Sequence, residues 1–129
     1  MAPPRIRPDD GRAAVIAVRD EISAGRVADG VGVSRPQLAT AVRYLLQALA
    51  DAHPGHTVEV RVPPFGAVQC VEGPRHTRGT PANVVEMDAP TWVSLAIGDL
   101  PWPDALAEVR VHASGSRADL STLVPLQEW

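Results

Sequence analysis

The hydrophobic period of the sequence changes between residues 49 and 58, and with it the secondary structure that the chain can form. Between Leu38 and Leu49 the apolar side chains recur every three or four residues, which is the spacing of one helix face. From Val58 to Val62 apolar and polar residues alternate strictly, as they do in a strand with one buried face. We therefore expect an α+β fold.

Capping residues and glycines indicate where the first helices begin and end. Asp9 and Asp10 are predicted to cap a first helix, which Gly25 would end. Residues 34–37, Ser-Arg-Pro-Gln, have the form of a capping box and open a second helix. The His-Pro-Gly run at residues 53–55 would stop that helix.

The middle of the chain predicts three strands. Residues 58–62 and 67–71 are separated by a proline- and glycine-containing turn at 63–66, so they could form a hairpin. A polar, glycine-rich stretch at 72–81 precedes a third strand at 84–87.

The last part of the chain predicts three short helices and a fourth strand. Asp88 would cap a helix that ends at Gly98, and a second helix covers residues 101–106. A strand follows at 109–113. Ser116 would then cap a last helix, which carries Leu120, Leu123 and Leu126.

Length, charge and cysteine content limit the class of protein. The 129 residues fit one domain over 1–129, with an arm and N-terminal helix in 1–34 and the core in 35–126. A net charge of -3 disfavours a nucleic-acid binder, which needs a clustered positive face. The single cysteine excludes an intramolecular disulfide. No apolar run is long enough to span a bilayer and the N-terminus lacks a signal-peptide pattern, so we expect a cytoplasmic protein without stable membrane insertion.

The sequence lacks the compact motifs of common enzymes. It has no Walker loop, no glycine-rich dinucleotide motif after a strand and no nucleophile elbow. The histidines do not follow the spacing of a zinc site; they are His53, His56, His76 and His112. Cys70 lies inside a predicted strand, where a thiol most often packs as a small hydrophobic group. We therefore expect no catalysis, no metal and no cofactor.

The most concentrated polar chemistry lies in one loop. Its guanidinium, imidazole and hydroxyl groups belong to Arg75, His76, Thr77, Arg78 and Thr80. Because the planar guanidinium binds carboxylates and phosphates in a bidentate way, the loop could hold an anionic head group. The alternative is a structural loop held by ion pairs to Glu72, Glu86 or Asp88.

Several segments of the chain resemble a known family. Sterol-carrier-protein domains are similar to it in the strand at 84–87, the Trp-x-x-Leu-Ala-x-Gly helix at 92–98, the segments 104–106 and 109–111, and Gly115. The short bacterial sterol-carrier-like proteins resemble it more closely, through residues 58–64, 73–81 and 114–121. The resemblance covers residues 36–126.

This resemblance implies a mixed β-sheet of about four to five strands, covered by helices that enclose an apolar tunnel. The tunnel would bind a fatty acyl chain, a sterol or a similar hydrophobic small molecule, with the Arg78 loop at its polar head. We expect it to be lined by Leu45, Leu49, Val60, Val68, Trp92, Leu95, Leu106, Leu120 and Leu123. Two alternatives stay open: an interaction domain with a filled core, acting through a partner or as a homodimer, and a small enzyme that uses His76 and Arg78.

Overall fold

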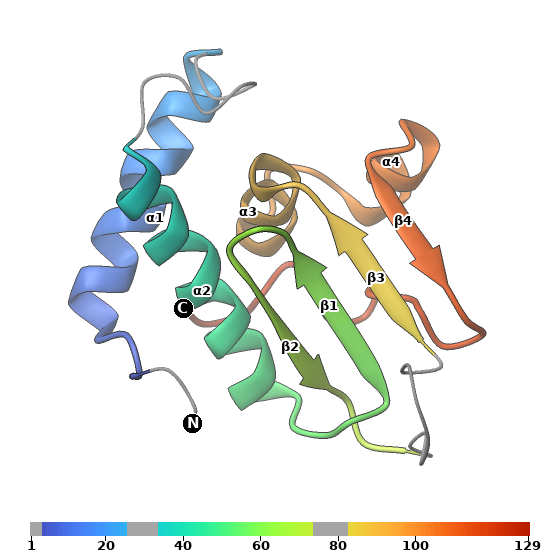
Figure 1. Cartoon of the computed structure of the whole chain (residues 1–129). Coiled ribbons are helices and arrows are strands. Elements are labelled where there is room, and N and C mark those ends of the chain that lie inside the picture. Colours follow the sequence, from blue (N-terminus) through green and yellow to red (C-terminus); the bar gives the residue numbers. More distant parts are fainter. Residues whose placement is uncertain (1–3, 26–33, 74–82) are drawn as a thin grey trace.

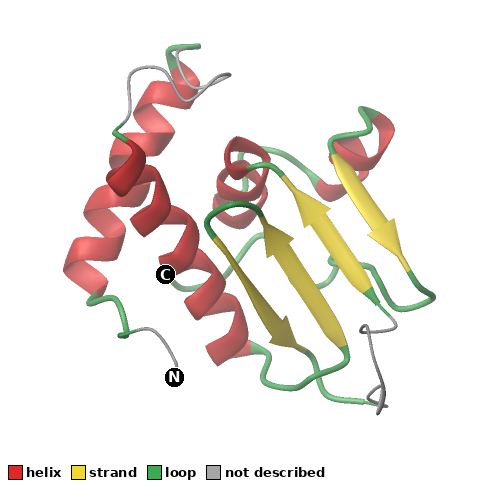
Figure 2. Ribbon diagram, in the orientation of Figure 1, coloured by secondary structure: helices red, strands yellow, loops and turns green. Residues whose placement is uncertain are grey.

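Helices α2 (Arg35–Ala52) and α3 (Ala89–Ile97) lie against one face of a four-stranded sheet, and α1 (Pro8–Ser23) packs on these helices (Figure 1, Figure 2). The computed structural model describes residues 4–25, 34–73 and 83–129. Its elements are α1 (Pro8–Ser23), α2 (Arg35–Ala52), β1 (Val58–Val62), β2 (Gly66–Cys70), β3 (Val84–Met87), α3 (Ala89–Ile97), α4 (Trp102–Ala107) and β4 (Val111–Ser114). The predicted α+β class is confirmed.

The sheet is mixed and has the strand order β2-β1-β3-β4. β1 pairs with β2 antiparallel and with β3 parallel, and β3 pairs with β4 antiparallel. In this register Val60 lies opposite Val68 and Val85. The strict alternation in β1 therefore turns its valines toward the helices, while Glu59 and Arg61 lie on the opposite face and bind each other there.

The predicted helix boundaries are confirmed where a side chain or a glycine sets them. The Ser34 hydroxyl accepts a hydrogen bond from the Gln37 amide at 3.2 Å, and the Asp88 carboxylate accepts one from the Thr91 amide at 2.8 Å. Gly98 ends α3 in the left-handed region, with φ +91°. The first helix differs from its prediction, because it begins at Pro8 and its acids lie in the first turn instead of capping it.

Helices α3 and α4 end in the same hydrogen-bond pattern with different residues. At α3 the amides of Gly98 and Asp99 bind the carbonyls of Leu95 and Ser94. At α4 the amides of Val109 and Arg110 bind the carbonyls of residues 106 and 105. Both are Schellman motifs, and Val109 takes the left-handed conformation, with φ +56°, that Gly98 takes at α3. Because residues 109 and 110 close the helix, the predicted strand at 109–113 starts two residues late.

The helix predicted after Ser116 does not form. Residues 115–129 are turns and extended segments, in which the amides of Leu123 and Val124 both bind the carbonyl of Leu120. Pro125 explains why a helix does not continue, since proline lacks an amide hydrogen and disfavours helical geometry in the residue before it. The leucines of this segment are buried as expected; they are Leu120, Leu123 and Leu126.

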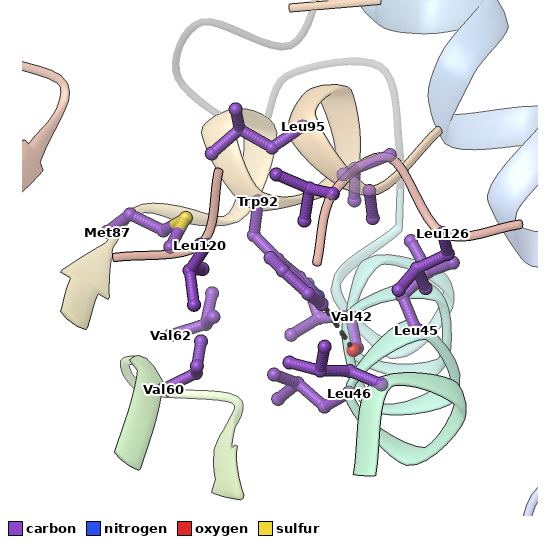
Figure 3. Close-up of a cluster of buried hydrophobic side chains, with 14 of the residues drawn as sticks. Val42, Leu45, Leu46, Val60, Val62, Met87, Trp92, Leu95, Leu120 and Leu126 are labelled. Carbon is purple, nitrogen blue, oxygen red and sulfur yellow. Dashed lines mark hydrogen bonds between the residues drawn. The ribbon is translucent and has the colours of Figure 1, made fainter. Parts of the chain in front are cut away.

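The core lies between the sheet and the helices and is organised around Trp92 (Figure 3). Its indole ring is fully buried and its Nε1 donates a hydrogen bond to the carbonyl of Val42 on α2, at 3.3 Å. Among the described residues every buried side-chain nitrogen and oxygen has a hydrogen-bond partner. The buried polar side chains of the described residues therefore carry no unsatisfied hydrogen-bonding group.

Helix α1 is positioned by a close contact with α2. A Cβ atom at Gly11 would lie 2.2 Å from the ring of Tyr44, so only glycine lets the two helices approach this closely. This contact also places the segment that precedes α1. In the part of the chain that the structure describes, no helix combines the length and apolarity needed to cross a bilayer.

Candidate ligand-binding groove

The residues predicted to line a tunnel are brought together, but most of them form a closed core. Six of them are 0% exposed, so no space as large as a water molecule adjoins their side chains. They are Leu45, Leu49, Val60, Trp92, Leu95 and Leu120. They come from α2, β1, α3 and the C-terminal segment and contact one another in one cluster. A close-packed interior of this kind offers no room for a ligand beside them.

The remaining three predicted residues lie elsewhere. Leu123 is 9% exposed at the rim of the core, and Val68 is half-buried on β2. Leu106 is 43% exposed because the short helix α4 buries only Trp102 and Ala105. Leu106 therefore lies outside the core cluster.

A groove of about 600 Å³ lies beside the core, where α2 runs alongside the edge strand β2 (Figure 1). Its helix wall comes from Thr40, Arg43, Leu46, Gln47, Ala50 and Asp51, its strand wall from residues 65–68 and its third wall from residues 4–6. The lining is mostly apolar, and the volume is in the range of sites that take small molecules.

The groove residues on α2 form a second stripe next to the buried one. Thr40, Arg43, Gln47 and Ala50 recur every three or four residues, as the core residues of the helix do. This spacing was the available signal for the groove in the sequence. It was missed because a stripe of mixed polarity is also typical of a solvated helix face.

One end of the groove carries positive charge. Arg43 donates from Nε to the carbonyl of Phe65 at 2.7 Å, and the guanidinium of Arg35 lies 5.3 Å from the centre of the Phe65 ring. Among the described residues neither arginine has an ion-pair partner. The outer nitrogens of Arg43 are thus available to an anionic group.

The opposite end is neutralised by an ion pair. Both outer nitrogens of Arg5 donate to the carboxylate of Asp51, with Nη1 to Oδ1 at 3.3 Å. These hydrogen bonds, together with the attraction of the carboxylate, raise the pKa of Arg5 above its ordinary value. The groove is therefore electrostatically asymmetric along its length.

The polar loop predicted to bind a head group lies outside the described residues. This applies to Arg75, His76, Thr77, Arg78 and Thr80. Of the acids considered as its partners, Asp88 is engaged as the cap of α3. The head-group role of the loop stays a prediction.

Cys70 lies fully buried in the core at the end of β2. Burial raises the pKa of its thiol to about 11, so the thiol is neutral near pH 7. His56 binds the side chain of Gln69 through Nδ1 at 2.6 Å. Within the described ranges, no three histidine, cysteine, aspartate or glutamate side chains are grouped so that they could hold a metal ion.

The family model of the bacterial sterol carrier protein (SCP) orthologs matches residues 34–126. This match begins at the cap of α2 and runs through the sheet to Leu126. The chain belongs to the bacterial SCP ortholog family. The resemblance stated from the sequence is thus confirmed, and so is the mixed sheet covered by helices. A search of curated proteins finds no match.

The SCP match divides the groove into two parts. The helix wall and the strand wall lie inside the matched region, whereas the wall made by residues 4–6 precedes it, as does α1. The groove is therefore completed by a segment that the family match does not include.

Proposed function

We propose that the protein binds a hydrophobic small molecule with an extended apolar chain, and that it does so without chemistry on the ligand. The observation that carries the proposal is the apolar groove between α2 and β2. Membership of the SCP family supports a carrier role. We place the ligand in this groove instead of a tunnel through the core, because six of the nine predicted tunnel residues are fully buried in one packed cluster.

The proposal includes an orientation for the ligand. A polar or anionic head would lie at Arg43, and the chain would run over Leu46 and Ala50 toward Ile6. Each buried methylene stabilises the complex by about 0.8 kcal/mol, which is about fourfold in affinity. Affinity should therefore rise about fourfold per methylene until the chain fills the groove.

The test is a series of straight-chain alcohols and carboxylates of increasing length, with binding measured by native mass spectrometry. Ala50→Leu places a bulky side chain in the groove and keeps a good helix former, so we expect it to weaken binding at least about tenfold. Ala13→Leu makes the same change at an exposed position of α1 and is the matched control. Equal binding by wild type and Ala50→Leu would exclude the groove as the site.

The filled core favours a second candidate function, an interaction domain that acts through a partner protein or as a homodimer. The groove would then take an apolar segment of the partner. Native mass spectra of the same samples give the subunit count, and a stable dimer whose formation Ala50→Leu prevents would support this candidate over ligand binding. The small enzyme that would use His76 and Arg78 is the third candidate and remains a prediction. On the sequence grounds given above, we propose that the protein acts in the cytoplasm.

A further inference from the structure

The segment before α1, residues 4–6, is attached to α2 at two places, and the first is the side chain of Gln47. The amide of Ile6 donates to Oε1 of Gln47 at 2.9 Å, and Nε2 of Gln47 donates to the carbonyl of Ile6 at 3.1 Å. A single side chain thus binds both polar main-chain groups of one residue, as a neighbouring strand would. Outside these bonds, Ile6 contributes a partly buried side chain packed on the core.

A second attachment lies one helical turn further along α2. There Arg5 binds both carboxylate oxygens of Asp51. The two side chains are 68% and 53% exposed. Exposed ion pairs contribute little to stability and are weakened by salt. The segment is therefore held at its outer end by a contact that opens at small cost.

Hollows lie on both sides of this segment. The groove of about 600 Å³ lies on one side, and a second hollow of about 440 Å³, which reaches Tyr44 and Trp129, lies on the other. Both hollows are lined by Arg5, Ile6, Gln47 and Asp51. The segment and its attachments thus separate two spaces that would join if the segment were released.

We infer that residues 4–6 are a strap that forms the movable wall of the groove and controls how fast an apolar ligand enters and leaves it. Gln47 and Asp51 are the positioning residues that hold the strap on α2. The inference rests on the proposed function, since it assigns a gate to the same groove. The other walls are hydrogen-bonded elements of the SCP-matched region, which makes the strap the part of the site that opens at least cost.

A charge exchange on the intact protein tests the strap. Arg5→Asp and Asp51→Arg each place like charges together, whereas the double variant restores an attractive pair in reverse. The probe is an uncharged pyrene-labelled long-chain alcohol, which removes any effect of salt on a head group. Its dissociation rate is measured by stopped-flow displacement with excess dodecanol.

We expect each single variant to release the probe about fivefold faster than wild type, and the double variant to return within about twofold of it. Raising the ionic strength from roughly 0.02 to roughly 0.5 M should accelerate release from wild type and from the double variant. Release from Arg5→Ala should be fast and nearly independent of salt, because no ion pair remains to be screened.

Arg19→Asp is the matched control, since it breaks a comparably exposed ion pair, with Asp99, away from the groove. It should leave the dissociation rate unchanged. Equal dissociation rates in wild type and both single variants would contradict the inference that residues 4–6 control release. The binding observed in the same experiment would still support the proposed function. A wild-type protein that binds neither the alcohol nor the carboxylate series would overturn both.

Discussion

Helix α2 borders two apolar regions that differ in what fills them. The closed core is filled by the protein itself, around side chains such as Val42 and Leu45. The groove, lined by Gln47 and Ala50 of the same helix, is left open. The strongest hydrophobic pattern in the sequence marks the closed region, because a continuous apolar stripe is what close packing requires. A ligand site instead needs an apolar surface whose packing partner is missing.

Truncation of Trp92 should have the largest effect and would show how much the core depends on being full. Trp92→Ala removes a fully buried ring and its hydrogen bond to Val42, so we expect a loss of about 3–5 kcal/mol in the free energy of unfolding. Chemical denaturation measures this loss. An unchanged denaturation midpoint would mean that the core is not the closed region described here.

The thiol of Cys70 reports whether the core opens. Its pKa of about 11 is two units above the ordinary value of 9.0, which alone lowers the thiolate fraction near pH 7 about a hundredfold. Labelling by a thiol reagent should therefore be at least about a hundredfold slower in the native protein than in denaturant. Fast native labelling would contradict a closed core.

The same thiol gives a pH dependence. The pKa of Cys70 is higher in the folded protein than in the unfolded chain. The stability that the neutral buried thiol contributes is therefore complete below about pH 9 and is lost as the pH rises toward about 11, because the unfolded chain ionises first. Cys70→Ala should lose less stability than wild type over that interval, measured by denaturation at several pH values.

Arg78 and Arg43 are alternative candidates for binding the ligand's head group. Comparing variants of the two would locate the polar end of the site. If the sequence-based hypothesis is right, Arg78→Ala weakens the binding of a fatty acid by about 1.5–3 kcal/mol and leaves the binding of an alcohol of equal length nearly unchanged. If the groove is the site, Arg43→Ala weakens the binding of the fatty acid instead. The loss is then at most about 1 kcal/mol, because the guanidinium of Arg43 is exposed.

The comparison needs melting temperatures beside the affinities. A substitution at residue 78 that lowers the melting temperature and weakens both ligands equally would make Arg78 a structural residue. If neither variant shows weaker binding of the fatty acid with unchanged binding of the alcohol, both head-group assignments are excluded.

The secondary structure could be predicted wherever its cause is local. Ser34, Asp88 and Gly98 act within one turn of a helix, and the alternation in β1 is a property of five successive residues. The last helix was predicted wrongly because its leucines have helical spacing, while the proline at 125 acts against helix formation.

The groove could not be predicted in the same way. Its third wall depends on the contact between Ile6 and Gln47, which are 41 residues apart, and no local pattern contains that pairing. The hydrophobic period shows which side chains avoid water but not which segment covers them. Most of the residues predicted to line a tunnel are therefore buried in the core, whereas the open groove lies along the next face of α2.

The left-handed valine after α4 makes this chain a candidate for improvement by a single substitution. The left-handed conformation costs a residue with a Cβ about 1–2 kcal/mol, and glycine's greater freedom in the unfolded chain offsets about 0.5–1 kcal/mol of that gain. Val109 is 70% exposed, so its side chain adds little by packing. Val109→Gly should therefore raise the free energy of unfolding by about 0.5–1 kcal/mol in thermal or chemical denaturation. Such a variant would be a more tolerant parent for engineering the groove, because substitutions that sacrifice stability for a new ligand would start from a higher reserve.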